Sequence, residues 1–112
     1  MAIPSGSGSE RLRRATLNDN TSWGEIISGT ALHIYTIISI IGCNRTSSAN
    51  LMSIRMNDGS NDIGLVEGLS VPSYGTLTFT DKFVLEEDDD LDIYSVGASD
   101  WIVSYIDQNW EN

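Results

Sequence analysis

Few residues in this chain of 112 carry side chains that commonly take part in catalysis or metal binding. The single cysteine, Cys43, excludes an internal disulfide, and the single histidine, His33, excludes a histidine-rich metal centre. Sixteen carboxylates are available for acid–base chemistry, but their spacing does not select a facing pair. We therefore expect a protein that is not an enzyme and has no cofactor, with His33 as a hydrogen-bonded strand residue and Cys43 as a small packing residue.

The densest group of potential ligands is the acidic run at residues 86–92, which reads Glu-Glu-Asp-Asp-Asp-Leu-Asp. Calcium takes six to eight oxygen ligands, and such a run could supply several of them. The run lacks the glycine and the distal glutamate of an EF-hand loop, and contiguous residues of an extended chain point to alternate sides. We expect a solvated loop between strands, or an electrostatic docking face, in preference to a metal site.

Charge excludes two classes of partner. Sixteen acidic residues against six basic ones give a formal net charge of −10 and a pI near 4.1. Binding to nucleic acid or to an anionic membrane needs an excess of lysine and arginine, so we expect neither. The most apolar stretch, residues 32–41, is about half the length that a membrane-spanning helix requires. With no signal peptide visible, we expect a soluble protein made in the cytoplasm.

The basic residues are concentrated at the N-terminus. Residues 1–14 carry a charge of +2, from Arg11, Arg13 and Arg14 against one glutamate, whereas residues 15–112 carry −12, from three basic and fifteen acidic residues. A Ser-Gly-Ser-Gly-Ser linker sequence precedes the arginines. We expect a flexible basic arm at 1–14 followed by one folded domain at 15–112. The arm is either an untidy terminus or a segment that orders on an acidic partner surface.

The elements that position these residues are strands. Apolar residues alternate with polar ones in several short segments, and no window of ten or more residues shows a helical stripe. Turn-forming residues separate these segments every eight to twelve positions, which is typical of a sandwich or jelly roll. The sequence predicts an all-β, antiparallel β-sandwich of jelly-roll type, with about eight strands near residues 15–18, 22–28, 31–41, 50–57, 62–67, 75–80, 83–86 with 91–96, and 100–107.

Aromatic residues give one further candidate contact. Trp23, Tyr94, Trp101 and Tyr105 fall within the strand patterns, and packing in the core explains them. Trp110 instead lies in a polar tail beyond the last alternating segment. It either folds back onto the sandwich or inserts into a pocket of a neighbouring molecule. Together with the three arginines of the arm, Trp110 is the residue that we expect to contact a partner.

Three segments carry a resemblance to a known family. They are the stretch Leu65–Leu77 with its Val-Pro-Ser-Tyr-Gly turn, the Val-Leu-Glu strand and acidic loop of Phe83–Ser95, and the closing strand Trp101–Ile106. Over residues 22–107 this pattern resembles small virion proteins of tailed bacteriophages, and among them capsid decoration, or cement, proteins. The family has no strict functional residues to transfer. The Ser-Gly arm and the Trp110 tail depart from its pattern.

The resemblance implies a function. It implies a structural virion protein that binds the major capsid protein on the outer surface of the head, as a homotrimer over local three-fold positions, and that stabilises the shell. Deleting residues 1–14 is then expected to weaken attachment without unfolding the domain. Two alternatives stay open. One is a neck, tail or fibre-associated virion module, and the other is a small carbohydrate-binding β-sandwich, which requires aromatic side chains clustered on one solvent-facing surface.

Overall fold

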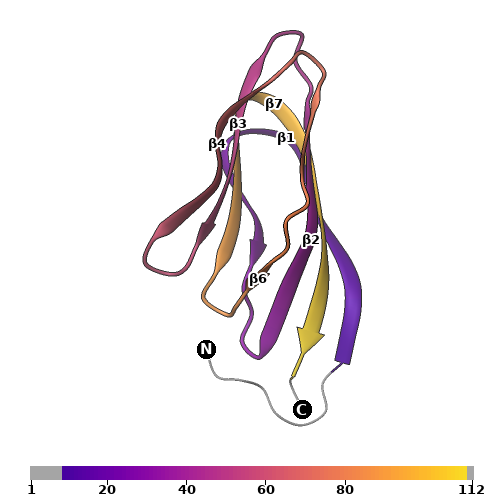
Figure 1. Cartoon of the computed structure of the whole chain (residues 1–112), viewed down its shortest axis with the longest axis vertical. Helices are drawn as coiled ribbons and strands as arrows, with labels where there is room; N and C mark the ends of the chain where they lie inside the picture. The colour runs from indigo at the N-terminus through magenta and orange to yellow at the C-terminus, as the bar shows by residue number, and fades with distance from the viewer. Residues whose placement is uncertain (1–8, 111–112) are drawn as a thin grey trace.

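A computed structural model describes residues 9–110 and contains seven strands, all paired antiparallel (Figure 1). The prediction of an all-β chain is confirmed. No helix within the described residues is long and apolar enough to cross a membrane. The strands are β1 (Ser9–Ser28), β2 (His33–Asn44), β3 (Asn50–Asn57), β4 (Asp62–Val71), β5 (Thr76–Phe79), β6 (Phe83–Leu85) and β7 (Asp90–Asn109).

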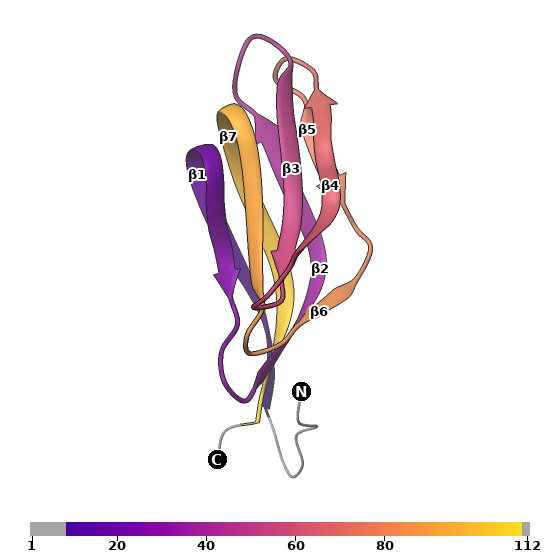
Figure 2. The same cartoon turned by 90° about the vertical axis from the view of Figure 1, so that its left-hand side faces the viewer.

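Two long strands determine the architecture. β1 and β7 each contain 20 residues and pair with each other from Ser9↔Asn109 to Ser28↔Asp90. Both bend at the same end of the molecule and return along the opposite side, as Figures 1 and 2 show. On its other edge, β7 pairs with β3 before the bend and with β2 after it. The bend therefore divides one continuous sheet into two facing layers.

The two layers form a sandwich. Layer one consists of β4, β3, the first half of β7 and the second half of β1. Layer two consists of the first half of β1, the second half of β7, β2, and β5 with β6. The inner faces of both layers supply the core, whose most buried side chains are Ile37, Ile40, Met52, Ile54, Leu85, Leu91, Ile93 and Val103. The predicted β-sandwich is confirmed.

β7 keeps its alternation through the bend. The odd-numbered residues from Leu91 to Asp107, apart from Gly97, are buried, and the residues between them are more accessible. Side chains of a strand point to alternate faces, so one face of β7 lines the interior along both layers. Paired strands share this alternation, since directly opposed residues of an antiparallel ladder have side chains on the same face. Register therefore determines which face each side chain of β1 and β2 occupies.

The predicted strand boundaries are wrong at both bends. Residues 15–18 and 22–28 are parts of the single strand β1, and residues 91–96 and 100–107 are parts of the single strand β7. The segments 83–86 and 91–96, expected together as one strand, are divided between β6 and β7, so the eight expected strands become seven. A bend normally ends a strand because its backbone groups lose their partners. Here a side chain replaces those partners: the Asn50 Oδ1 atom accepts from the N–H groups of Val96 and Gly97, at 3.0 and 2.9 Å.

The expected flexible arm at residues 1–14 is wrong for its second half. Residues 9–14 begin β1 and pair in register with residues 104–109 of β7. Backbone N–H and C=O groups of this segment bond to β7 in place of water. This pairing holds residues 9–14 in place as an edge strand. Residues 1–8 of the expected arm lie outside the described residues. The basic segment is thus part of the sandwich from Ser9 onward.

Candidate interaction surfaces

The outer face of layer two carries two groups of apolar side chains, separated by the row of Arg14, Ser104 and Ser39. Register places Leu12, Ile106, Thr36 and Val84 in one row across the four strands, all facing outward. Leu12 is 72% exposed and Val84 is 43% exposed. All seven strands of the described chain are used in the two layers, and none packs on this side. We call this surface the apolar face, and its members are Leu12, Ile34, Ile41, Val84, Ile102 and Ile106.

Charged side chains lie at the margins of the apolar face. Glu10 and Arg14 stand on the edge strand β1, and Asp100 lies near the bend of β7. The Gln108 Nε2 atom donates to the Glu10 carboxylate at 3.1 Å, and this hydrogen bond joins the side chains of β7 and β1 at this end of the sheet. Near Asp100 a shallow, mainly apolar depression of about 170 Å³ is lined by Ile41, Cys43, Asp100, Trp101 and Ile102. Apolar side chains bordered by polar and charged groups are typical of a protein interface.

The three arginines that we expected to act together point in different directions. Register puts Arg11 and Arg13 on the inner side of β1, opposite Asp107 and Tyr105, and puts Arg14 on the outer side, opposite Ser104. The Arg13 guanidinium pairs with the Asp107 carboxylate at 3.1 Å, which raises the pKa of Arg13. Arg13 is therefore engaged within its own chain. All three arginines are exposed, and Arg13 is the one that pairs with Asp107.

Asp107 is a buried carboxylate with two basic partners. Its side chain is 3% exposed, and its second oxygen lies 2.7 Å from the His33 Nδ1 atom. Tyr35 packs against both His33 and Tyr105, with ring centroids 5.8 and 5.2 Å away. Burial raises the pKa of Tyr105. His33 is thus a hydrogen-bonded strand residue, as predicted, and this group joins the ends of β1, β2 and β7.

Replacing Asp107 by asparagine is expected to lower the free energy of unfolding by about 2 kcal/mol, because a charged buried acceptor is lost while the Arg13 guanidinium keeps its charge. Chemical denaturation at neutral pH measures the loss. The control is Asp81→Asn, a carboxylate between β5 and β6, which is expected to stay within about 0.5 kcal/mol of the unaltered chain. Equal effects of the two variants would contradict this role of Asp107.

Trp110 extends the ladder between β7 and β2. Its backbone N–H donates to the Leu32 carbonyl at 2.9 Å, one position beyond the pair His33↔Asn109. The residue is half-buried, and the indole Nε1 atom is buried without a hydrogen-bond partner among the described residues. Of the two placements expected for Trp110, the structure has the one in which the residue folds back onto the sandwich.

The outer face of layer one is aromatic and charged. Trp23 and Tyr94 are register partners whose ring centroids are 5.1 Å apart, and Trp23 is 42% exposed. The Arg55 guanidinium lies 3.8 Å from the centroid of the Trp23 ring and pairs with Asp92 at 3.5 Å. The prediction that Trp23 and Tyr94 pack in the core is wrong, because register turns them outward. Trp101 and Tyr105 do lie in the core, as predicted.

Carboxylates on the outer face of layer one raise one another's pKa. Burial raises the pKa of Asp92, with Asp90 and Asp62 contributing, although Arg55 opposes this shift. Burial and the charges of Asp90 and Asp92 also raise the pKa of Glu25 above its ordinary value of 4.5. A carboxyl group whose pKa is higher in the folded than in the unfolded state destabilises the fold when ionised. That destabilisation is complete above the raised pKa and disappears as the pH falls through it.

Replacing Glu25 by glutamine is therefore expected to stabilise the fold at pH 7 and to leave it unchanged near pH 3.5. Glu25 is exposed, so solvent screening limits the gain to a few tenths of a kcal/mol. Thermal unfolding at several pH values measures this difference. Glu67→Gln on β4 is the matched control. A gain that is equal at pH 3.5 and pH 7 would contradict the electrostatic origin of the effect.

The acidic run does not converge on one point. Asp89 folds back so that its Oδ2 atom accepts from the Glu86 N–H at 2.8 Å, whereas Asp90 and Asp92 belong to β7. Within residues 9–110, no group of three or more histidine, cysteine, aspartate or glutamate side chains could hold a metal ion. The expected solvated loop is therefore reduced to a turn between β6 and β7.

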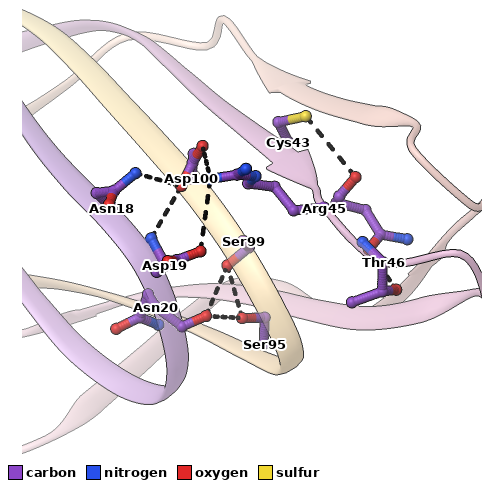
Figure 3. Close-up of polar contacts among 10 residues, drawn as sticks. Asn18, Asp19, Asn20, Cys43, Arg45, Thr46, Ser95, Ser99 and Asp100 are labelled. Carbon is purple, nitrogen blue, oxygen red and sulfur yellow. Dashed lines mark hydrogen bonds and ion pairs between the residues drawn. The ribbon is translucent and has the colours of Figure 1, made fainter.

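The bends of β1 and β7 are joined by polar contacts, drawn in Figure 3. The Asn20 carbonyl accepts from the hydroxyl groups of Ser95 and Ser99, at 3.0 and 3.2 Å. Asp100 accepts from the Asp19 backbone N–H at 2.8 Å and pairs with Arg45 at 3.3 Å. These contacts satisfy backbone groups that the ladder leaves unpaired at the bends. Sequence patterns did not indicate this cluster because its contacts join residues 55 to 81 positions apart.

No protein-family model matches this sequence, and no curated protein matches it either. Among solved structures, a chain of infectious bursal disease virus, Gt strain, aligns with 96% of this chain at a TM-score of 0.50 and 8% identity. The likeness is one of fold. A chain of the Gx strain aligns with 97% of this chain at a TM-score of 0.47 and 8% identity. This chain spans 32% and 40% of the length of those viral chains, respectively.

One further similar structure comes from Bacillus endospore appendages, described as a novel family of disulfide-linked pili. It aligns with all of this chain and with 97% of its own length, at a TM-score of 0.48 and 12% identity. At such identities none of these comparisons bears on the activity or the partners of this chain.

Proposed function

We propose that this chain is a structural virion protein that binds the outer capsid surface of a tailed bacteriophage and acts as a decoration, or cement, protein. The observation that carries the proposal is the apolar face of layer two. Six aliphatic residues face outward in two groups, with the row of Arg14, Ser104 and Ser39 between the groups. Exposed apolar patches on a soluble protein are a common mark of protein contacts.

The partner that fits this face is the major capsid protein. A shell presents many identical sites, so even a modest contact per site yields high avidity when the bound protein is multivalent. A protein that spans neighbouring shell subunits binds only the assembled state, and by linkage it stabilises that state. The chain needs no catalytic group or cofactor for this role. A sandwich fold shared with a chain of infectious bursal disease virus supports a place in a virus particle.

The decisive experiment mixes the purified full chain with phage heads that lack it, pellets the heads and images them. The proposal expects saturable binding and added density on the outside of the head. Density at the neck, tail or fibres would favour the alternative of another virion module. Absence of the chain from intact particles, together with no binding to heads, would overturn the proposal.

A carbohydrate-binding sandwich is the second candidate, and the outer face of layer one favours it. Trp23 and Tyr94 lie side by side facing solvent, with Asp92 and Glu25 in the adjacent row. Aromatic rings can stack on sugars, and carboxylates can accept hydrogen bonds from sugar hydroxyls. A glycan array tests this function. Binding that the variant Trp23→Ala abolishes would support it, and an array without hits would dismiss it.

A further inference from the structure

β1 forms an edge of both layers. It pairs with β7 along its whole length and with no other strand among the described residues. The opposite edge of layer two is formed by β5 and β6, which pair only with β2, and the opposite edge of layer one is β4, which pairs only with β3. Unpaired backbone groups on such edges are templates for another strand.

Strand directions make the two edges compatible. β7 runs antiparallel to β1 and to β2, so β1 and β2 share one direction. β5 and β6 run antiparallel to β2 and therefore also to β1. When a second copy stands beside the first in the same orientation, its β1 meets β5 and β6 in antiparallel fashion. The same reasoning applies in layer one, where β4 runs opposite to the second half of β1.

The lengths of the two edges also correspond. The first half of β1 runs from Ser9 to Leu17 without a register shift. The opposite edge covers residues 76–85, interrupted only by the link between β5 and β6. Across layer two, Arg11 is level with Leu85 through Asp107 and Tyr35. Similar lengths at similar levels allow one edge to lie along the other.

The charges at these levels are complementary. Residues 9–14 carry +2, from three arginines against Glu10, and residues 80–87 carry −2, from Asp81, Glu86 and Glu87 against Lys82. Arg14 is level with Ser39, beside the link that contains Asp81. Charged edges often serve to prevent pairing of like with like. Opposite signs on opposite edges discourage pairing of β1 with β1 and favour pairing of β1 with β5 and β6.

We propose that copies of this chain associate head to tail, with β1 of one copy added to the β5–β6 edge of the next so that layer two continues from copy to copy. Such a contact uses two different surfaces, so it closes into a ring or extends into a filament according to the rotation between copies. A three-membered ring is the trimer expected from the family resemblance. The association leaves the apolar face open for another partner, so it stands whether or not the chain binds a capsid.

A disulfide trap tests this contact in the full chain. Thr16 and Thr78 are exposed on the outer face of layer two and share a row with Ile102 and Ile41 between them. Three strand spacings, about 14 Å, separate them within one chain. A disulfide requires Cα atoms within about 7 Å, so cysteines at these positions can bond only between copies. The variant Thr16→Cys/Thr78→Cys is made with Cys43→Ser.

Mild oxidation of this variant is expected to produce disulfide-linked species larger than dimers on a non-reducing gel. A second variant, Thr16→Cys/Thr76→Cys, captures a pairing that is shifted by two residues. The control is Thr16→Cys/Thr36→Cys, because Thr36 faces outward on β2 with β6 and β7 on either side and reports contacts between faces.

The proposal is overturned if neither edge pair links faster than the Thr36 control, or if the unaltered chain sediments as a monomer at every concentration.

Charge reversal gives an independent readout. Arg14→Glu and Asp81→Arg are each expected to weaken association by about tenfold or more, and the double variant is expected to recover most of the loss. Circular dichroism shows whether each variant keeps its sheet.

Discussion

Replacing Asn44 by alanine is expected to lower the free energy of unfolding by about 3 kcal/mol or more. The Asn44 side chain is fully buried, and its Nδ2 atom donates to the carbonyls of Ser48, Val71 and Pro72 at 2.9 to 3.1 Å. Its Oδ1 atom accepts from the backbone and the hydroxyl of Thr46. Alanine leaves these groups without partners at the point where three segments meet, and equilibrium denaturation measures the cost.

The matched control is Asn18→Ala, because Asn18 is exposed and makes one side-chain hydrogen bond, to Asp100 at 3.0 Å. This control is expected to change stability by no more than about 0.5 kcal/mol. If both variants unfold at the same denaturant concentration, Asn44 does not organise this end of the sandwich.

A glutamate at either edge of the apolar face is expected to abolish most of the proposed capsid binding. We expect Leu12→Glu and Val84→Glu each to weaken binding to heads by about tenfold, equivalent to 1.4 kcal/mol, because a carboxylate would be buried against apolar surface. Both side chains are already largely exposed, so the fold should tolerate the change. Because several sites act together, occupancy of heads falls more steeply than the affinity of one site. Co-sedimentation with heads measures this loss.

Leu51→Glu is the control for this experiment. Leu51 is 50% exposed and belongs to β3 in layer one, so the variant adds the same charge to the same molecule away from the apolar face. Binding of this control is expected to match that of the unaltered chain. A larger loss for Leu51→Glu than for Leu12→Glu would place the contact on layer one and contradict the proposed orientation.

The two outer faces carry different kinds of side chain. Layer two presents aliphatic side chains, whereas layer one presents Trp23, Tyr94 and a row of ionised groups around Arg55. Head-to-tail addition along β1 would place like faces side by side. An assembly would then offer one apolar surface and one polar, aromatic surface. The experiments on Trp23 and Thr16 address the aromatic face and the edge, whereas Leu12 belongs to both the apolar face and the edge strand β1.

Local sequence was sufficient to predict the fold class and several elements. The alternation of Met52, Ile54 and Met56 with polar residues predicted the strand 50–57, whose bounds are those of β3. The polar segment 57–62 predicted the turn before β4, where the Asp58 carboxylate accepts from the N–H groups of Ser60 and Asn61. These features depend on side chains within a few positions of one another. Short-range patterns therefore carry the information.

Only the tertiary structure determined the continuity of β1 and β7 and the faces that their side chains occupy. The bend of β7 is satisfied by Asn50, some 46 positions away, so no local pattern distinguishes it from a loop. Trp23 faces outward, and Arg13 reaches Asp107, because register shifts in β1 and its pairing with β7 set their orientation. Alternation determines that a strand has two faces, but only pairing with distant strands decides which face is buried.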